Sequence, residues 1–256
     1  MQCEITSGGL RLSGYLARPE ALTDAPLTDA PRPGLVLCHG FPSGPGGAAT
    51  SGQTYPQLAE RLVADTGWVV LAFNFRGTGA SQGEFSLAGW LDDLRAAIDH
   101  LLAAGGISGV WLAGSGTGGS LVLCEAGEDE RVRGVATFSA RADFGDWAGD
   151  PGGFLDHARN IGVIDDPDFP ADFESWSREL REIRPTALIA KIPPRPVLVV
   201  HGADDDIVPL DDARILTDAA GDAVELRVLS EAGHRLRHDP RAVALLMGWM
   251  ERQTGR

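Results

Sequence analysis

Basic residues are scarce in this sequence relative to acidic ones. The 256 residues include 22 lysines and arginines against 36 aspartates and glutamates, so the formal net charge is −14. A chain with this charge repels the phosphate backbone of nucleic acids and the anionic headgroups of lipids. We therefore expect neither nucleic acid nor a membrane surface as a partner.

Long apolar runs and paired cysteines are also missing. No stretch approaches the roughly 18 apolar residues of a membrane-spanning helix, and residues 1–9 lack the basic and apolar regions of a signal peptide. The cysteines Cys3, Cys38 and Cys124 are odd in number and widely spaced, which indicates neither a disulfide framework nor a zinc site. These absences predict a soluble, cytoplasmic protein without a metal or a cofactor.

Short apolar runs alternate with longer amphipathic stretches, and 43% of the residues are hydrophobic, which is enough for one substantial core. This alternation is typical of an α/β fold in which a mostly parallel central sheet has helices on both faces. Residues 10–17 alternate in hydrophobicity and are expected to form an antiparallel strand at the sheet edge. The expected buried strands are residues 34–38, 68–73, 110–113, 132–138, 197–200 and 224–229. The expected helices are residues 55–65, 87–102, 117–126, 210–219 and 240–252.

Three segments interrupt this alternation. Residues 22–31 contain the sequence Leu-Thr-Asp-Ala-Pro twice and are expected to form a surface loop. Residues 40–52 hold five glycines directly after a strand, where a backbone bends sharply or approaches a ligand. Residues 142–191 stand where connections of about 2–6 residues are usual, and they carry interspersed aromatic residues. This insert is predicted to be a helical cap over a core domain of residues 1–141 and 192–256; the alternative is a surface excursion without function.

Four motifs, two of them glycine-rich turns, follow the expected strands. In chain order they are residues 38–42 (CHGFP), 74–81 (NFRGTGAS), 114–119 (GSGTGG) and 201–209 (HGADDDIVP) with 232–234 (AGH). In this order and spacing the motifs resemble the α/β-hydrolase superfamily, and more narrowly its bacterial esterase, acyl-peptidase and dienelactone-hydrolase-like branches. The resemblance extends over about residues 10–249 and implies an α/β-hydrolase fold.

The resemblance also implies a catalytic machinery. In this family a G-x-S-x-G turn places a serine nucleophile above the sheet, and an acid and a histidine follow in that order. Carried over position by position, the acid is Asp205 and the base is His234, both at the carboxyl edge of the sheet, where ligands of α/β proteins bind. The backbone N–H groups of Phe41 and Thr117 would form the oxyanion hole.

The serine position of the turn is occupied by Gly116. Gly114 and Gly118 align with the glycines of the family motif, so the nucleophile position has no side chain. A frame shifted by one residue would make Ser115 the nucleophile, but it would place Thr117 where the turn needs a small residue. Ordinary acyl-enzyme catalysis is therefore not expected at Gly116, and a water activated by His234 and Asp205 is the physical alternative.

Three interpretations remain open at this stage. The first is an esterase-like hydrolase of small acyl, ester or amide substrates that works through water or Ser115. The second is a non-catalytic binding or regulatory protein on the same scaffold. The third is a sporadic or engineered substitution at Gly116 in an ordinary serine hydrolase. Eleven acidic residues lie between Asp143 and Glu182, within the expected cap. If this cap covers the site, its field favours a small neutral or cationic ligand.

Overall fold

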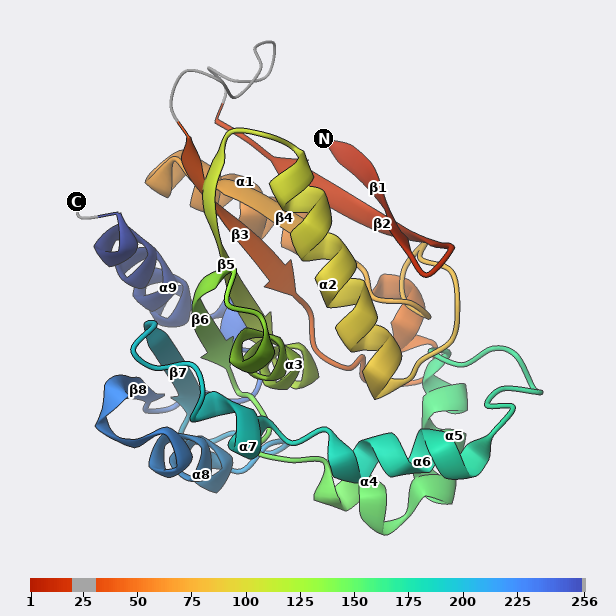
Figure 1. Cartoon of the computed structure of the whole chain (residues 1–256). Coiled ribbons are helices and arrows are strands. Elements are labelled where there is room, and N and C mark those ends of the chain that lie inside the picture. The colour runs from red at the N-terminus through yellow and green to blue at the C-terminus, as the bar shows by residue number, and fades with distance from the viewer. Residues whose placement is uncertain (20–30, 255–256) are drawn as a thin grey trace.

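The computed structural model describes residues 1–19 and 31–254, which form one mixed sheet between two layers of helices (Figure 1). The strand order is β1-β2-β4-β3-β5-β6-β7-β8. Only the pairs β1–β2 and β2–β4 are antiparallel, and all other neighbours run parallel. The strands are β1 (Gln2–Ser7), β2 (Leu10–Ala17), β3 (Arg32–Cys38), β4 (Val69–Phe73), β5 (Ile107–Ser115), β6 (Val132–Phe138), β7 (Val197–Gly202) and β8 (Val224–Leu229).

The prediction that residues 10–17 form the edge strand is wrong in one respect. Strand β2 does form over these residues and is antiparallel, but β1 pairs with it on the outer side. The connection consists of Gly8 and Gly9, with φ angles of 55° and 86°. Two consecutive residues with positive φ make the tight hairpin turn that matches the twist of paired strands, and glycine adopts this conformation without strain. The Gly-Gly pair between two alternating runs was the local signal for this hairpin.

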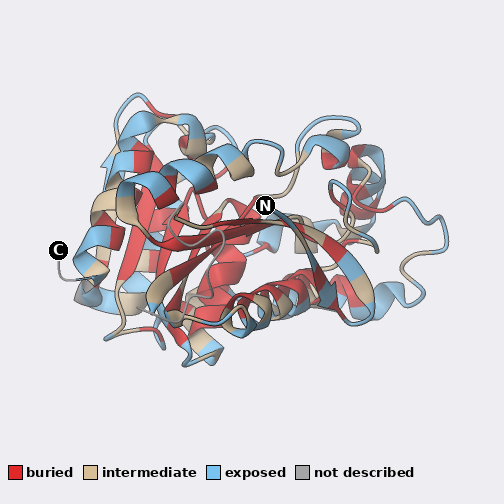
Figure 2. Ribbon diagram, turned by 90° about the horizontal axis from the view of Figure 1, so that it is seen from above, coloured by how far each residue is buried: buried red, intermediate tan, exposed pale blue. Residues whose placement is uncertain are grey.

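Helices cover both faces of the sheet, as the sequence predicts. Helices α1 and α9 pack on one face through a cluster that includes Leu35, Val70 and Trp249, while α2, α3 and α8 pack on the other. Figure 2 shows the buried residues concentrated along the strands between these layers. No helix in residues 1–19 and 31–254 has the length and hydrophobicity to cross a lipid bilayer. The flanking helices are α1 (Tyr55–Thr66), α2 (Leu87–Ala103), α3 (Thr117–Glu128), α8 (Leu210–Ala220) and α9 (Pro240–Gln253).

The insert between β6 and β7 is helical. It contains α4 (Gly145–Gly149), α5 (Pro151–Ile161), α6 (Phe173–Glu182) and α7 (Pro185–Ile189). Local capping defines two of these helices, because Asp150 accepts the N–H of Gly153 at the start of α5 and Asp172 accepts that of Ser175 at the start of α6. Figure 1 shows α4, α5 and α6 grouped together beyond one end of the sheet. The boundaries of a separate cap domain, 142 and 191, stay a prediction, and residues 22–30 of the Leu-Thr-Asp-Ala-Pro repeat lie outside the described residues.

Candidate active site

The turn between β5 and α3 is a single residue, Gly116. Strand β5 ends at Ser115 and α3 begins at Thr117, so the chain reverses direction at a backbone with φ 52° and ψ −125°. Such a conformation is costly for residues other than glycine. A Cβ atom on Gly114 would clash with the carbonyl of Gly118, and one on Gly118 would clash with the carbonyl of His39. The motif glycines are therefore required by close backbone approach, and the turn has the strand-turn-helix geometry of a nucleophile elbow.

Asp205 follows β7, and its side chain is completely buried. One carboxylate oxygen, Oδ1, accepts the backbone N–H groups of Ile207 at 3.0 Å and Val208 at 2.9 Å. Burial by itself would raise the pKa of Asp205, but the hydrogen bonds from His234 and from these backbone groups outweigh it and hold the pKa well below its usual range. Asp205 is therefore an ionised carboxylate at neutral pH.

His234 connects this carboxylate to the elbow. Its Nδ1 atom lies 3.0 Å from Oδ2 and 3.2 Å from Oδ1 of Asp205. An ionised carboxylate only accepts hydrogen bonds, so Nδ1 of His234 donates to it and Nε2 is the ring nitrogen on the other side. Nε2 faces the turn, because a Cβ atom built on Gly116 would lie 3.4 Å from it. The structure thus brings together Asp205, His234 and Gly116, which are far apart in the sequence, with the free nitrogen of the histidine directed at the missing side chain.

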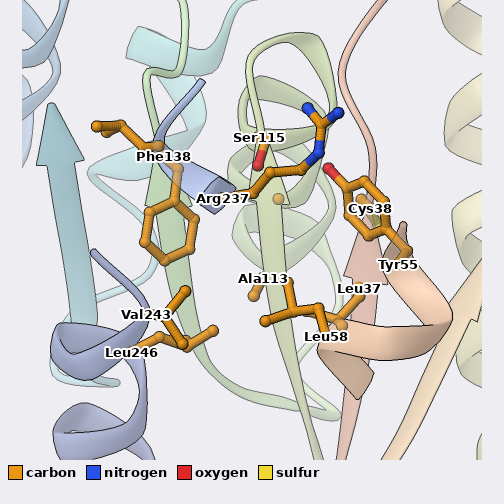
Figure 3. Close-up of a pocket in the computed structure, with 12 residues that line it drawn as sticks. Leu37, Cys38, Tyr55, Leu58, Ala113, Ser115, Phe138, Arg237, Val243 and Leu246 are labelled. Atoms are coloured by element: carbon orange, nitrogen blue, oxygen red, sulfur yellow. The ribbon is translucent and has the colours of Figure 1, made fainter. Parts of the chain in front are cut away.

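Ser115 does not take the place of this side chain. It lies at the end of β5 and faces a small enclosed cavity that is also lined by Tyr55, Leu236 and Arg237 (Figure 3). No hydrogen bond joins Ser115 to His234 among residues 1–19 and 31–254. The alternative alignment, in which Ser115 is the nucleophile, requires a hydrogen bond from Ser115 to His234 to activate the serine, and this hydrogen bond is missing.

The loop after β3 is held in place by His39, which is buried among aromatic rings. The backbone N–H of Phe75 donates to Nε2 of His39 at 3.1 Å, so Nδ1 carries the proton and donates to the carbonyl of Gly40 at 2.8 Å. Burial lowers the pKa of His39 to about 4, which keeps the ring neutral. His39 therefore supports the backbone of this loop rather than acting as an acid or base.

Two backbone N–H groups are available next to the elbow. Phe41 and Thr117 both line the cleft in front of Gly116. Thr117 is the first residue of α3, where N–H groups have no partner within the helix. Within the described chain, neither N–H donates a hydrogen bond to another residue. Their position is compatible with the predicted oxyanion hole, and the role itself stays a prediction.

The cleft in front of the elbow has a volume of about 500 Å³. The insert contributes Trp147 and His157 to its lining, and three arginines, Arg141, Arg235 and Arg237, face it as well. Ten of the eleven acidic residues between Asp143 and Glu182 are exposed at the surface, and none of the eleven lines the cleft. The acidity that motivated the expectation of a neutral or cationic ligand is therefore located on the outside of the insert.

Sequence reasoning missed two groups that line the cleft beside the elbow. Tyr55 opens helix α1, and the guanidinium carbon of Arg237 lies 5.6 Å from the centre of its ring. The two residues are 182 positions apart, and neither belongs to a motif. Arg237 follows His234 by three residues, but nothing in the local sequence indicates which way its side chain points.

A mostly parallel sheet, a one-residue glycine turn and a histidine paired with a buried carboxylate together define the class of α/β hydrolases. The model of the alpha/beta hydrolase family matches residues 35–245, so the chain belongs to this family. It is 28% identical over 172 residues to the uncharacterized protein YfhR of Escherichia coli, a match that includes 64% of this chain. The chain spans about half the length of these curated relatives, since the match includes 52% of them.

Solved structures with a similar fold include several hydrolases. Est1E from Butyrivibrio proteoclasticus has a TM-score of 0.71 at 19% identity, covering 99% of this chain and 97% of its own. The esterase domain of a Rhodothermus marinus protein has a TM-score of 0.68 at 22% identity, covering 99% and 97%. The acylaminoacyl peptidase of Pyrococcus horikoshii has a TM-score of 0.70 at 20% identity, covering 98% of this chain and 41% of its own. At these identities the likeness shows a common fold.

Proposed function

We propose that this chain is an esterase-like hydrolase of small acyl, ester or amide substrates in which a water molecule replaces the serine nucleophile. The observation that carries the proposal is the distance of 3.4 Å between Nε2 of His234 and the position of a Cβ on Gly116. A histidine that ionised Asp205 holds by Nδ1, and whose Nε2 is directed at a space without a side chain, is oriented to take a proton from water.

The reaction is a single displacement. The water oxygen attacks the carbonyl carbon while Nε2 of His234 accepts the proton, and the negative charge that develops on the carbonyl oxygen is held by the N–H groups of Phe41 and Thr117. The tetrahedral intermediate then expels the alcohol or amine, which takes the proton back from His234. Asp205 stabilises the imidazolium between these two proton transfers.

The expected rate is low compared with that of serine esterases. Removing the nucleophile from a triad costs about a millionfold in turnover and leaves roughly 10³–10⁴-fold acceleration from the oxyanion hole and binding. A positioned general base contributes about 10²–10⁴-fold. We therefore expect slow turnover of activated esters, without a covalent intermediate.

The test is hydrolysis of short p-nitrophenyl esters by the parent protein and by the variant His234→Ala. The proposal predicts a loss of about 100-fold in kcat/KM for this variant, because the base that accepts the proton is gone. The matched control is His100→Ala, which removes a histidine from the last turn of α2, outside the cleft, and should retain the parent rate. Equal rates for the parent and His234→Ala would refute the proposal.

A second candidate function is supported by Gly116 itself. A protein that has kept the cleft and lost the nucleophile would bind a small ligand without turning it over. This non-catalytic candidate predicts no hydrolysis by the parent protein, no labelling by a fluorophosphonate probe, and measurable binding of a small ligand. Covalent labelling mapped to Ser115 would contradict both this candidate and the water mechanism.

A further inference from the structure

Three polar side chains line both the cleft and a smaller neighbouring cavity. Tyr55, Ser115 and Arg237 come from α1, from the end of β5 and from the segment after β8, and all three line both the cleft and the small cavity beneath it (Figure 3). Tyr55 is only 4% exposed, yet its hydroxyl has no hydrogen-bond partner within residues 1–19 and 31–254. A buried hydroxyl without a partner is costly, so its retention next to a cleft points to a ligand that completes it.

Arg237 also lacks a carboxylate partner. Its guanidinium group lies over the ring of Tyr55, and its Nε makes one long hydrogen bond of 3.4 Å to the hydroxyl of Thr54. No carboxylate lies within 4.0 Å of it in the part of the chain that the structure describes. Arg141, which also lines the cleft, is by contrast paired with Asp146 at 2.7 Å. The terminal N–H groups of Arg237 are therefore free to bind an anion.

The charge around these groups has one sign. Although the chain carries a net charge of −14, no acidic side chain lines the cleft among the described residues. Asp205 does not line the cleft. Its carboxylate is buried and accepts a hydrogen bond from Nδ1 of His234. Burial raises the pKa of Tyr55, so the phenol keeps its proton and donates at neutral pH. The cation of Arg237, the buried Tyr55 hydroxyl and the adjoining Ser115 hydroxyl form an environment for a carboxylate.

We propose that Arg237, Tyr55 and Ser115 form a carboxylate-binding subsite, and that the ligand of this cleft carries a carboxylate in addition to its acyl group. The inference deepens the proposed function, on which its second part rests, by naming the substrate class: monoesters or monoamides of short dicarboxylic acids. The planar guanidinium of Arg237 binds the carboxylate with two parallel hydrogen bonds, and the hydroxyls of Tyr55 and Ser115 donate to it. Ser115 thereby has a binding role that needs no activation by His234.

The experiment compares two probes that differ only in the charged group. The monoamides of succinic, glutaric and adipic acid each carry one carboxylate, and the corresponding diamides are neutral. Binding is measured by calorimetry, so the result does not depend on whether the protein hydrolyses these compounds. We expect at least one monoamide to bind the parent protein about tenfold more tightly than its diamide, as one charge-assisted contact implies.

Four variants locate the effect. Arg237→Gln should abolish the preference for the monoamide, while Tyr55→Phe and Ser115→Ala should each weaken it several-fold without changing the shape of the site. Arg214→Gln is the matched control, because it removes the same charge from an exposed residue on α8 and should leave the preference intact. Circular dichroism verifies that each variant is folded. If Arg237→Gln does not fold, the binding preference of Tyr55→Phe and Ser115→Ala tests the subsite instead.

Three results would overturn the inference. One is equal or tighter binding of the diamides, which would favour the neutral ligand expected from the acidity of the insert. Another is a preference for the monoamides that persists in Arg237→Gln. The last is tighter binding of inorganic phosphate than of any monoamide, which would assign the subsite to a different anion. Absence of ester hydrolysis would refute the proposed function and leave the binding comparison unaffected.

Discussion

At the scale of single residues, the chemistry of the site depends on the missing side chain of Gly116. Asp205, His234 and the N–H groups of Phe41 and Thr117 lie around this position, which in the proposed function differs from that of a serine hydrolase by one hydroxymethyl group. The backbone there has φ 52°, so a side chain would cost on the order of 1–3 kcal/mol of stability. Glycine relieves this strain, and the surrounding groups remain arranged as if a nucleophile were present.

Gly116→Ser is therefore expected to create esterase activity. The Cβ would lie 3.4 Å from Nε2 of His234, which places a serine hydroxyl within hydrogen-bond reach of the base. The variant should hydrolyse p-nitrophenyl acetate with a burst and form an acyl-enzyme visible by mass spectrometry. Gly116→Ala is the control, since it has the same backbone strain and no hydroxyl. If both variants are equally inactive, the Asp205–His234 pair does not activate a serine in this site.

At the scale of elements, helix α3 carries a buried acid that faces α2. Glu125 is almost completely buried and forms an ion pair with Arg95 of α2 at 3.0 Å. Burial, assisted by the nearby Asp129, raises the pKa of Glu125 to about 7 despite this partner. The folded state therefore binds a proton more tightly than the unfolded state, in which a glutamate has its ordinary pKa near 4.3.

The free energy of unfolding therefore depends on pH through Glu125. Folding favours protonated Glu125. The contribution of Glu125 to the free energy of unfolding is therefore largest below about pH 4.3, and this contribution falls as the pH rises to about 7. Glu125→Gln should remove this fall and stabilise the protein at pH 8 by about 1–3 kcal/mol. Urea denaturation at pH 5, 7 and 8 measures the effect, with Glu130→Gln, an exposed residue just after the same helix, as the control. An equal pH dependence in both variants would contradict the assignment.

At the scale of the whole molecule, the insert and the sheet share one hydrophobic core. Phe154 of α5 lies 5.5 Å from Phe41 and 5.9 Å from Phe85, measured between ring centres. The indole N–H of Trp176 donates to the carbonyl of Phe85 at 3.1 Å, and Glu179 accepts the N–H of Ala88 in the first turn of α2. These contacts join the insert to Phe41 in the loop after β3 and to the segment before α2, so we expect insert and core to unfold together.

Phe154→Ala is expected to destabilise the whole chain. Loss of a buried phenylalanine costs about 3–5 kcal/mol, and the shared core should transmit this loss to the sheet. Thermal unfolding followed by tryptophan fluorescence and by circular dichroism should give one coincident transition at a lower midpoint. Phe173→Ala, at a residue that is 43% exposed, is the control and should change the midpoint little. Two separate transitions in either the parent or Phe154→Ala would show that the insert folds independently.

The sequence by itself determined the class of the fold, the family and the position of the elbow. These features depend on local patterns: hydrophobic periodicity places β6 and β8 at the predicted residues, and the glycines around Gly116 are required by the turn itself. The pairing of Asp205 with His234 could be anticipated because both follow parallel strands, whose carboxyl ends share one edge. Strand β1 and its edge hairpin were not predicted, although Gly8 and Gly9 carried the signal for the turn.

The tertiary structure alone decided which way side chains face and which charges lie inside the cleft. Ser115 points toward Tyr55 rather than His234 because the one-residue turn at Gly116 directs successive residues to different sides. The insert is acidic in sequence, but its helices turn their carboxylates outward to solvent, while Arg237 reaches the cleft from a distant segment. Composition adds charges regardless of position, whereas a binding site responds to the few that packing brings within hydrogen-bond reach.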